Sequence, residues 1–538
     1  MIAAFVYFTG VRVDTMDVDA SQYAEMSLSM SKSHTPLQLY DRGADYLDKP
    51  PFLFWVNAVS MRAFGANNFA YKLPSILFAL WAVFATYRLA KLLYDEETGR
   101  LSALLLATCQ GMFLMTNDVR CDTILMAWVV TAVWQLAEWS RSQRLGNLLW
   151  GCVAIGFGMM TKGPIALMVP VFCFISDWSL KRRWNMFFKP QYLVGIAIIG
   201  ILLIPMCIGL YTQYDMHPEK KISGLRFFFW SQSFGRITGE SPWKNGADMS
   251  FLLLNMLWSF LPWIFLFVTA MAVNVVELVK NRFRLAANGE WITTGGFLLS
   301  YLSLGSSAYQ LPHYIFVAFP LAAIVTGAFL TRMLRGGEYP KVLKFFKPFQ
   351  SAILLLLFFA LCLLTCYCFP AGPVVWAALA ICLVFWFRIF FRKHHEKLIT
   401  LGVLGSIIVN LFISNALYPT LLTYQAGNTV GRFIKDKGIP TQSVISYKMH
   451  DAVVALHFYA QDLIPGTDSI KEIGARTYVL TMDEGLHDLQ QRYRLSPVYT
   501  GKLFKVSELT PEFLNPATRD KELRNYYLMH IEGKTVGN

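Results

Sequence analysis

Residues 191–212 read QYLVGIAIIGILLIPMCIGLYT, a run without a charged side chain. A helix of that length, rising about 1.5 Å per residue, matches the roughly 30 Å hydrocarbon core of a bilayer. Because comparable runs recur, we expect an α-helical polytopic membrane protein with about thirteen transmembrane helices. The shorter run at 2–13 is counted among them, as a span that is incomplete in this chain or adapted at its N-terminus. The others lie near 69–92, 101–117, 122–139, 147–161, 163–178, 250–278, 291–306, 311–331, 350–369, 372–391 and 398–418.

The composition is also that of a membrane protein. The mean hydropathy is +0.41, and 55% of the residues are hydrophobic. The net charge of +13 would suggest nucleic acid in a soluble protein, but here most of the surplus lies in short loops between apolar runs. The positive-inside rule explains that placement, so we expect no nucleic-acid partner. No cysteine follows residue 382 and metal-type cysteine spacing is absent, which excludes a disulfide framework in the tail.

Basic residues alternate between the two sides of the predicted bundle. Twenty-one lysines and arginines gather in every second loop, whereas the short intervening turns hold only Arg120 and Lys162. The basic loops are therefore predicted to be cytoplasmic. They lie near 88–100, 141–144, 181–189, 280–284, 332–347 and 388–397. The outer side then receives segment 14–68, the turns near Asp122 and Lys162, loop 213–249 and everything after about residue 420.

The chain divides into a membrane domain, 1–420, and a polar tail, 421–538, which we expect to form a small extracytoplasmic α/β domain. In the first outer loop, 14–68, two short helices with apolar faces are expected to lie on the membrane surface. They are Ala20–Ser31 and Phe52–Phe64, the second opened by Pro50-Pro51. The tail predicts helices at Asn428–Lys437 and Glu484–Tyr493, and strands near Ser443–Tyr447, Thr477–Thr481 and Tyr526–Ile531.

Acidic residues mark the outer rim of this bundle. Asp17, Asp19, Asp48 and Asp122 all lie at the ends of apolar runs on one predicted side. Ionised carboxylates are costly in hydrocarbon and usually mark function where they cluster beside it. The placement favours an active site at the membrane surface over a conducting path through the bundle.

The first two acids form an Asp-x-Asp triplet shortly before Tyr23. Asp17 and Asp19 point the same way if the chain is extended, so they could share a cation or a proton. A divalent ion shared by Asp17, Asp19 or Asp48 stays open on the sequence, and no firm cofactor is indicated. The alternative is a hydrated loop whose aspartate caps the following helix.

Two lysines could hold a phosphate. Lys49 follows Asp48 in Tyr46-Leu-Asp48-Lys49-Pro50-Pro51, where the prolines stiffen the loop. The alternative is an interfacial lysine attracted to lipid headgroups. Lys162 is a lone cation on the outer side, against the positive-inside trend. Asp122 opens an apolar run, where a helix N-terminus favours an anion and capping alone would explain it.

Two further outer segments carry candidates. Arg236 lies among the aromatic residues of loop 213–249 and could clamp a phosphate bidentately, although such aromatics normally form an interface belt. The outward turn 309–314 holds Gln310, His313 and Tyr314. A histidine there is more often a wet interfacial side chain than a ligand.

In order along the chain, these motifs resemble the lipid A aminoarabinose transferases. That group and the related protein O-mannosyltransferases belong to the GT-C glycosyltransferase superfamily. The likeness covers roughly residues 14–335 well and the rest mainly by topology. The matching motifs are Asp19-x-x-x-Tyr23-Ala-Glu25, Tyr46-x-Asp48-Lys49-Pro50, Phe64-Gly-Ala-Asn-Asn-Phe69, Asp122 at its helix start, Met160-Thr-Lys162-Gly, Phe260-Leu-Pro-Trp263 and Leu311-Pro-x-Tyr314.

The resemblance implies thirteen spans, surface helices in the first outer loop and a periplasmic C-terminal domain. It implies a polyprenyl-monophosphate-linked sugar as donor and inversion at the anomeric carbon. It places Asp19 and Asp122 as the catalytic aspartates. The residues expected to bind substrate are Asp17, Tyr23, Tyr46, Asp48, Lys49, Lys162, Arg236, Gln310 and Tyr314, with no metal ligand assigned.

The chain departs from that pattern at several positions. Ala308 and Gln310 stand where the resemblance implies lysines, and this loss of positive charge leaves the acceptor open between lipid A, another envelope lipid or glycan, and a protein. Ala20, Gln22 and Asp48 replace a carboxylate, an arginine and a glutamate.

The resemblance therefore implies an inverting glycosyltransferase of the bacterial inner membrane, with its active site and tail in the periplasm. An enzyme resembling the protein O-mannosyltransferases is the first alternative. A lipid-linked sugar flippase would want ionisable groups at mid-membrane, which the apolar runs here lack away from their ends. A non-catalytic envelope scaffold is a third reading.

Overall fold

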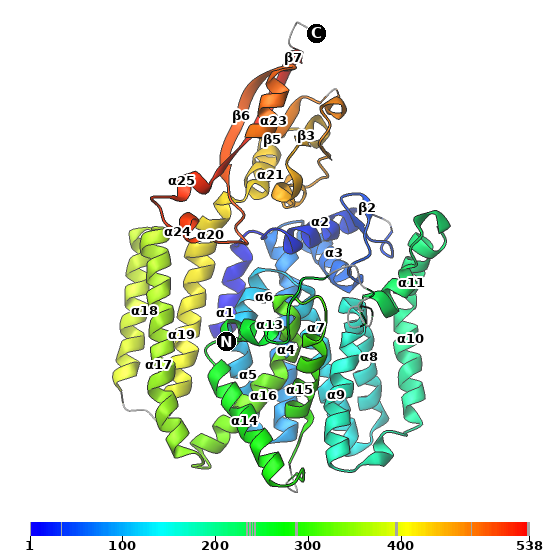
Figure 1. Ribbon diagram of the computed structural model, residues 1–538, viewed down its shortest axis with the longest axis vertical. Coiled ribbons are helices and arrows are strands. Elements are labelled where there is room, and N and C mark those ends of the chain that lie inside the picture. The colour runs from blue at the N-terminus through cyan, green and yellow to red at the C-terminus, as the bar shows by residue number, and fades with distance from the viewer. Residues whose placement is uncertain are drawn as a thin grey trace.

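The structure is a computed structural model that describes residues 2–33, 35–232, 235, 238, 240, 244–285, 289–392, 396–474 and 476–534. Long helices stand side by side in a bundle, and a small β-rich part sits on one end of it (Figure 1). The bundle helices are α1 (Ile2–Thr9), α4 (Asn68–Leu93), α5 (Glu96–Thr108), α6 (Gln110–Asn117), α7 (Cys121–Ser142), α8 (Leu145–Lys162), α9 (Ile165–Leu180), α10 (Gln191–Leu210), α13 (Phe251–Ser259), α14 (Ile264–Lys280), α15 (Ile292–Gly305), α16 (Phe319–Leu334), α17 (Pro340–Cys362), α18 (Pro373–Phe391) and α19 (Lys397–Phe412).

Six helices in the described ranges are long and apolar enough to cross a membrane. They are Asn68–Leu93, Gln191–Asp215, Pro312–Leu334, Pro340–Cys368, Pro373–Phe391 and Lys397–Tyr424. Side chains on the outer helices fit this environment: Ile196 on α10, Phe359 on α17 and Phe385 on α18 are each more than half exposed. The coarse prediction of a mostly helical membrane protein is confirmed, whereas the number thirteen stays a prediction.

Two expected spans are not continuous helices. The run at 101–117 divides at Cys109, whose backbone is extended, into α5 and α6. The run at 250–278 divides between Ser259 and Ile264, around Pro262, which cannot donate a helical hydrogen bond. Apolarity over about twenty residues shows burial in lipid or protein but does not show where a helix breaks.

The first outer loop forms the two helices expected of it. α2 (Asp19–Lys32) and α3 (Phe52–Phe64) lie across the end of the bundle, beneath the β-rich part (Figure 1). A short hairpin of β1 (Tyr40–Asp41) and β2 (Ala44–Asp45) connects them. Pro50 and Pro51 precede α3 and restrict the backbone at its start. The loop therefore covers the bundle end at which the predicted acids lie.

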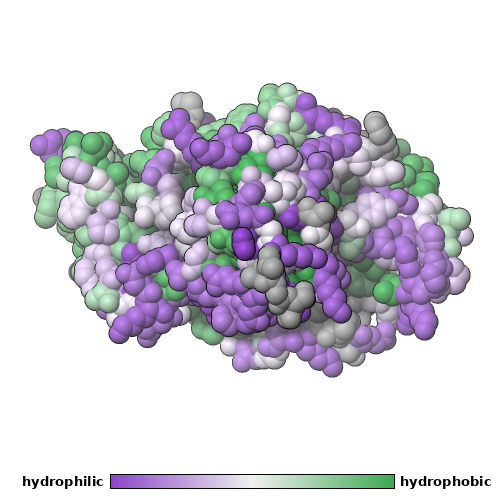
Figure 2. Space-filling view, turned by 90° about the horizontal axis from the view of Figure 1, so that it is seen from above, coloured by the Kyte–Doolittle hydropathy of each residue, from purple (hydrophilic) through white to green (hydrophobic). Residues whose placement is uncertain are grey.

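The polar tail forms a five-stranded mixed sheet in the order β4-β3-β5-β7-β6. The helices α21 (Ala426–Asp436), α22 (Leu456–Ala460) and α23 (Asp483–Gln490) belong to the same region. Seen from above, polar residues cover much of this face, and apolar residues show between them and around its margin (Figure 2). The strands are β3 (Val444–Tyr447), β4 (Gly466–Thr467), β5 (Tyr478–Met482), β6 (Tyr493–Leu503) and β7 (Arg524–Lys534).

One tail prediction is wrong: the helix expected to run to Tyr493 ends at Gln490, and Tyr493 begins β6. Pro497 and Gly501 obscure this strand in the sequence, since both are unfavourable in strand interiors. The structure accommodates Pro497 at an irregularity in the pairing of β6 with β7, between Pro497 and Tyr499.

Candidate active site

Four chain segments place charged groups at the covered end of the bundle. They are the N-terminus of α2, the loop before α3, the junction of α6 and α7, and the end of α8 with the 3-10 helix η6 (Pro312–Ala318) that packs against α7. The first two belong to the outer loop 14–68 and the others to the bundle end that this loop covers. Asp19, Asp48 and Asp122 are each paired with a basic side chain there.

Asp19 is the first residue of α2, and one of its carboxylate oxygens pairs with Arg120. The Arg120 guanidinium also binds Asp118, with 2.9 Å between Nε and Oδ2. Burial by itself lowers the pKa of Arg120, but Asp118 and Asp19 outweigh it and leave that pKa above its ordinary value. Arg120 stays charged and fixes the Asp19 carboxylate by a charge-assisted bond.

Asp122 lies in the first turn of α7, where the helix N-terminus stabilises an anion. Its side chain is 2% exposed, and its Oδ1 lies 2.6 Å from Lys162 Nζ. His313 Nε2 lies 3.7 Å from the other oxygen, and the Lys162 ammonium stands 4.2 Å from the centre of the Tyr314 ring. An aromatic face and a carboxylate thus hold one buried cation.

The position of Lys162 follows from local backbone geometry. It is the last residue of α8, and the next residue, Gly163, has φ +89 and ψ −161, a conformation that only glycine adopts readily. The Gly163 N–H donates to Met159 O at 2.7 Å and closes the final turn. The helix therefore stops where its terminal lysine faces α7.

Lys49 pairs with Asp48 beside Tyr46. Its side chain is 12% exposed. Burial lowers the pKa of Lys49, but the Asp48 carboxylate, with Cys121 and Tyr314, raises it above its usual value overall. The ammonium is therefore charged, and Pro50 and Pro51 restrict the backbone that carries it.

The separate pairs share one electrostatic environment. Burial raises the pKa of the Tyr23 phenol first, and Tyr46, Cys121 and Asp19 add to that effect while Arg120 opposes it. The pKa of Tyr46 is raised by burial and then by Asp48, Cys121 and Asp19. Groups from α2, from the loop before α3 and from the junction of α6 and α7 therefore act on the same two phenols, which both pack edge-on against Phe54.

Two cavities border this cluster. A narrow one of about 20 Å³ is lined by Tyr46, Lys49, Pro50 and apolar side chains of α10, including Met206 and Leu210. A larger one of about 470 Å³ lies between Asp17–Val18 and the β-rich part. The first is mainly apolar but also lined by Gln213. The second combines apolar side chains, such as Met449 and Leu503, with charged ones such as Arg524.

Two predicted site residues bond to the backbone outside the ion pairs, and a third is not described. The Asp17 carboxylate accepts the Ala455 N–H at 3.1 Å, whereas Asp19 faces Arg120. Gln310 is fully buried, and its amide donates to backbone carbonyls, including Gly305 O at 2.8 Å. Arg236 lies outside the described residues.

Arg120 and His313 join the cluster although sequence reasoning gave them little weight. Arg120 is one of only two basic residues in the outer turns, a signal that identified Lys162 and applied equally to Arg120. His313 adjoins Pro312 in the turn that already supplied Tyr314. Both add basic groups beside the carboxylates Asp19 and Asp122.

The described residues do not suit a resident metal ion. Within them, no three histidine, cysteine or acidic side chains come together in a manner that could hold one. The acids considered for a shared divalent ion contact separate partners: Asp17 the backbone, Asp19 Arg120, and Asp48 Lys49. We therefore derive no chemical step through a metal.

Comparison with known proteins identifies the fold. A model of the family dolichyl-phosphate-mannose-protein mannosyltransferase matches residues 48–208. The crystal structure of ArnT from Cupriavidus metallidurans bound to undecaprenyl phosphate superposes with a TM-score of 0.73 at 15% identity, covering 98% of this chain and 96% of that one. The chain has the ArnT fold. Together with the apolar helices, this makes it a multi-pass membrane protein.

The chain is also similar in sequence to curated transferases of this fold. An undecaprenyl phosphate-alpha-4-amino-4-deoxy-L-arabinose arabinosyl transferase from Edwardsiella ictaluri is 26% identical over 335 residues, 61% of this chain and 57% of its own length. The enzyme of that name from Erwinia tasmaniensis is 28% identical over 315 residues, 57% of this chain and 54% of its own length. The match spans little more than half of these relatives. The resemblance to the aminoarabinose transferases is confirmed.

Proposed function

We propose that the chain is an inverting glycosyltransferase that moves a sugar from a polyprenyl (undecaprenyl) monophosphate to a cell-envelope acceptor, of lipid A type or another. One observation carries the proposal: two restrained cations, Lys49 and Lys162, share one buried cluster with the carboxylates Asp19 and Asp122. Cations suit a phosphate leaving group, and a carboxylate suits an acceptor hydroxyl. The curated relatives are named for such a donor.

In the reaction, the bond between the anomeric carbon and the phosphate oxygen breaks, and the phosphate leaves with the electron pair. The acceptor oxygen bonds to the opposite face of that carbon, which inverts its configuration. Lys49 and Lys162 stabilise the negative charge that grows on the phosphate. Asp19, held by Arg120, takes the acceptor's hydroxyl proton, and Asp122 stabilises the positive charge developing on the sugar ring.

We assign a side to each substrate from the two cavities. The narrow one joins Lys49 to the apolar side chains of α10, and we place the lipid phosphate there with its tail in the membrane. At about 20 Å³ this space has room for little more than a water, so it must widen to admit the donor. The larger one is walled by Asp17 and Val18, directly before Asp19, and suits the acceptor. Tyr23, Tyr46, Asp48 and Tyr314 shape the space between these sides. Arg236 is retained as an expected phosphate ligand.

The proposed location in the cell follows from the apolar helices and the basic loops. Residues 1–420 form the membrane domain of about thirteen spans in the inner membrane, and residues 421–538 form a periplasmic α/β domain. The active site then faces the periplasm, on the side opposite to the basic loops. Membrane lipids surround the apolar helices.

Binding of undecaprenyl phosphate to the purified chain tests the donor side. We expect Lys49→Met to weaken binding by about tenfold to a hundredfold, because a charge-assisted phosphate contact contributes about 1.5–3 kcal/mol. Lys341→Met, exposed in the first turn of α17 at the opposite end, is the matched control and is expected to bind as the wild type does. Equal affinity of the two variants would contradict the proposed donor site.

A protein acceptor is the second candidate, favoured by the match of residues 48–208 to the protein mannosyltransferase family. Mass spectrometry of envelope lipids and glycoproteins, with and without the chain, separates the two. A sugar lost from a lipid supports the first candidate, and one lost from a protein supports the second. No difference in either fraction would contradict both.

A further inference from the structure

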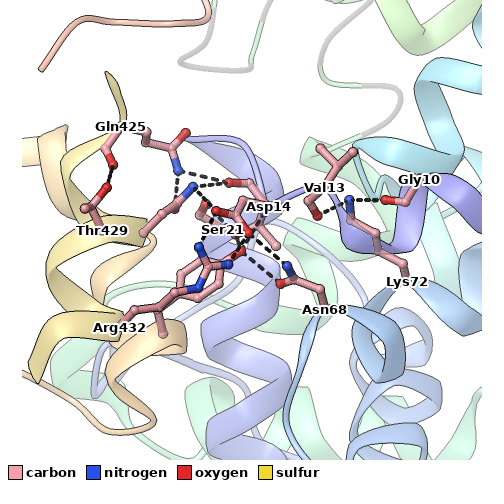
Figure 3. A network of polar contacts seen from close by, with 12 residues as sticks. Gly10, Val13, Asp14, Ser21, Asn68, Lys72, Gln425, Thr429 and Arg432 are labelled. Atoms are coloured by element: carbon pink, nitrogen blue, oxygen red, sulfur yellow. Dashed lines mark hydrogen bonds and ion pairs between the residues drawn. The ribbon is translucent and has the colours of Figure 1, made fainter. Parts of the chain in front are cut away.

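The segment that leads into Asp19 is held from both sides. Residues 13–18, which are irregular up to Met16 and form a turn at 17–18, lie between the membrane bundle and the tail, and their polar groups bond to both. From the bundle, the buried Lys72 of α4 donates to Gly10 O at 3.1 Å and Val13 O at 2.7 Å. From the tail come Arg432 of α21 and Gln425 just before it (Figure 3). Tyr459 of α22 and Ala455, just before that helix, add further bonds.

Asp14 is the central residue of this network. Its carboxylate binds the Arg432 guanidinium through both oxygens, with 2.8 Å between Arg432 Nη1 and Asp14 Oδ2. The same carboxylate accepts from Asn68 Nδ2 at 3.0 Å, so α4 and α21 bind one side chain (Figure 3). Arg432 also covers the Tyr459 ring, with its guanidinium carbon 4.6 Å from the ring centre.

The backbone of the next residues is bound just as closely. The Thr15 N–H donates to the Tyr459 hydroxyl at 2.8 Å, and Gln425 Nε2 donates to Thr15 O at 2.9 Å. The Asp17 N–H donates to Gln425 Oε1 at 2.9 Å, while the Asp17 carboxylate accepts the Ala455 N–H. Tail side chains therefore fix the path of the chain up to two residues before Asp19.

We infer that the tail is a working part of the active site, because this clasp, formed by Asp14, Gln425, Arg432 and Tyr459, sets the position of Asp19. Asp14, Gln425, Arg432 and Tyr459 are positioning residues: they act through the backbone of 14–18 and make no contact with the donor. Asp17 takes the same role in place of the substrate contact expected from the sequence. The inference rests on the proposed function.

The geometry also indicates which step of the reaction depends on the clasp. Lys49 and Lys162 lie on other segments, so donor binding does not depend on the clasp. Residues 17 and 18 form a wall of the cavity assigned to the acceptor, whose opposite wall is tail residues such as Met449 and Leu503. Loosening the clasp therefore displaces Asp19 and the acceptor wall together.

The test compares Asp14→Asn, Arg432→Gln and the double variant in three measurements: sugar transfer, affinity for undecaprenyl phosphate and thermal stability. We expect each single variant to lose about tenfold to a hundredfold in kcat, since a misplacement of about 1 Å costs that much. The double variant should lose no more than the worse single variant, because both remove one interaction. Donor affinity and melting temperature should stay close to wild type.

Lys502→Met is the matched control, because it breaks an ion pair of the same tail, with Asp520 at 2.7 Å, away from segment 13–18. It should transfer at the wild-type rate. Wild-type transfer by the clasp variants would overturn the inference alone. Parallel losses of stability, donor affinity and transfer would overturn it too, because they would show that the clasp only stabilises the fold. A wild-type chain that binds no undecaprenyl phosphate would instead overturn the proposed function and, with it, this inference.

Discussion

At the scale of single residues, the site consists of ion pairs that connect distant parts of the chain. The sequence indicates Asp122 by its place at the start of an apolar run and Lys162 as a lone cation on the outer side. A single sequence does not show that two such residues, forty positions apart, meet at 2.6 Å. For the same reason Arg120, which appears in the sequence as one more loop cation, was not predicted to hold Asp19.

The burial of the Asp122–Lys162 pair leads to a testable prediction. Asp122→Asn leaves the buried ammonium uncompensated and should destabilise the protein by about 3–5 kcal/mol. Adding Lys162→Met removes the stranded charge, so the double variant should recover most of the stability while transfer stays absent. Glu338→Gln, at a more exposed pair with Arg332, is the control and should change the melting temperature little. A double variant as unstable as the single one would contradict this account of the pair.

At the scale of secondary structure, much of the first outer loop could be predicted. Its two helices agree closely with the expected ranges, because Pro50-Pro51 and the apolar faces are local signals. β6 could not be predicted, since Pro497 and Gly501 oppose a strand locally and only pairing with β7 offsets them. The contacts of Asp17 with the tail are equally non-local.

Within α2, Glu25 makes the stability depend on pH. Burial raises its pKa from 4.5 to about 7, although bonds from Ser29 and the Arg42 N–H oppose the shift. Between pH 4.5 and about 7, the folded state therefore keeps a proton on Glu25 that the unfolded state has lost. Stability should fall as pH rises from 4.5 through 7, by up to about 3 kcal/mol.

Glu25→Gln removes the titrating group, so it should flatten the pH dependence of the free energy of unfolding in that window. Denaturant unfolding of both proteins between pH 4.5 and 8 checks this. Glu484→Gln, at a side chain largely exposed in the tail, is the control and should leave the profile of the wild type unchanged. A Glu25→Gln profile as steep as that of the wild type would contradict the assignment.

At the scale of the whole molecule, the charge distribution predicts which end faces which compartment. In a background without the native cysteines, Glu508→Cys in the tail should react with a membrane-impermeant maleimide on intact spheroplasts. Lys341→Cys, exposed at the opposite end, should react only after the membrane is opened. The reverse labelling pattern would place the cluster in the cytoplasm and contradict a periplasmic reaction.

The molecule as a whole is proposed to gather a lipid-phosphate donor and an acceptor around Asp19. Sugar transfer by Asp19→Asn, measured beside its affinity for undecaprenyl phosphate, tests that claim most directly. The amide keeps the size of the side chain but cannot take the acceptor's proton. We predict wild-type affinity for undecaprenyl phosphate and no detectable transfer. Transfer at the wild-type rate would contradict the account.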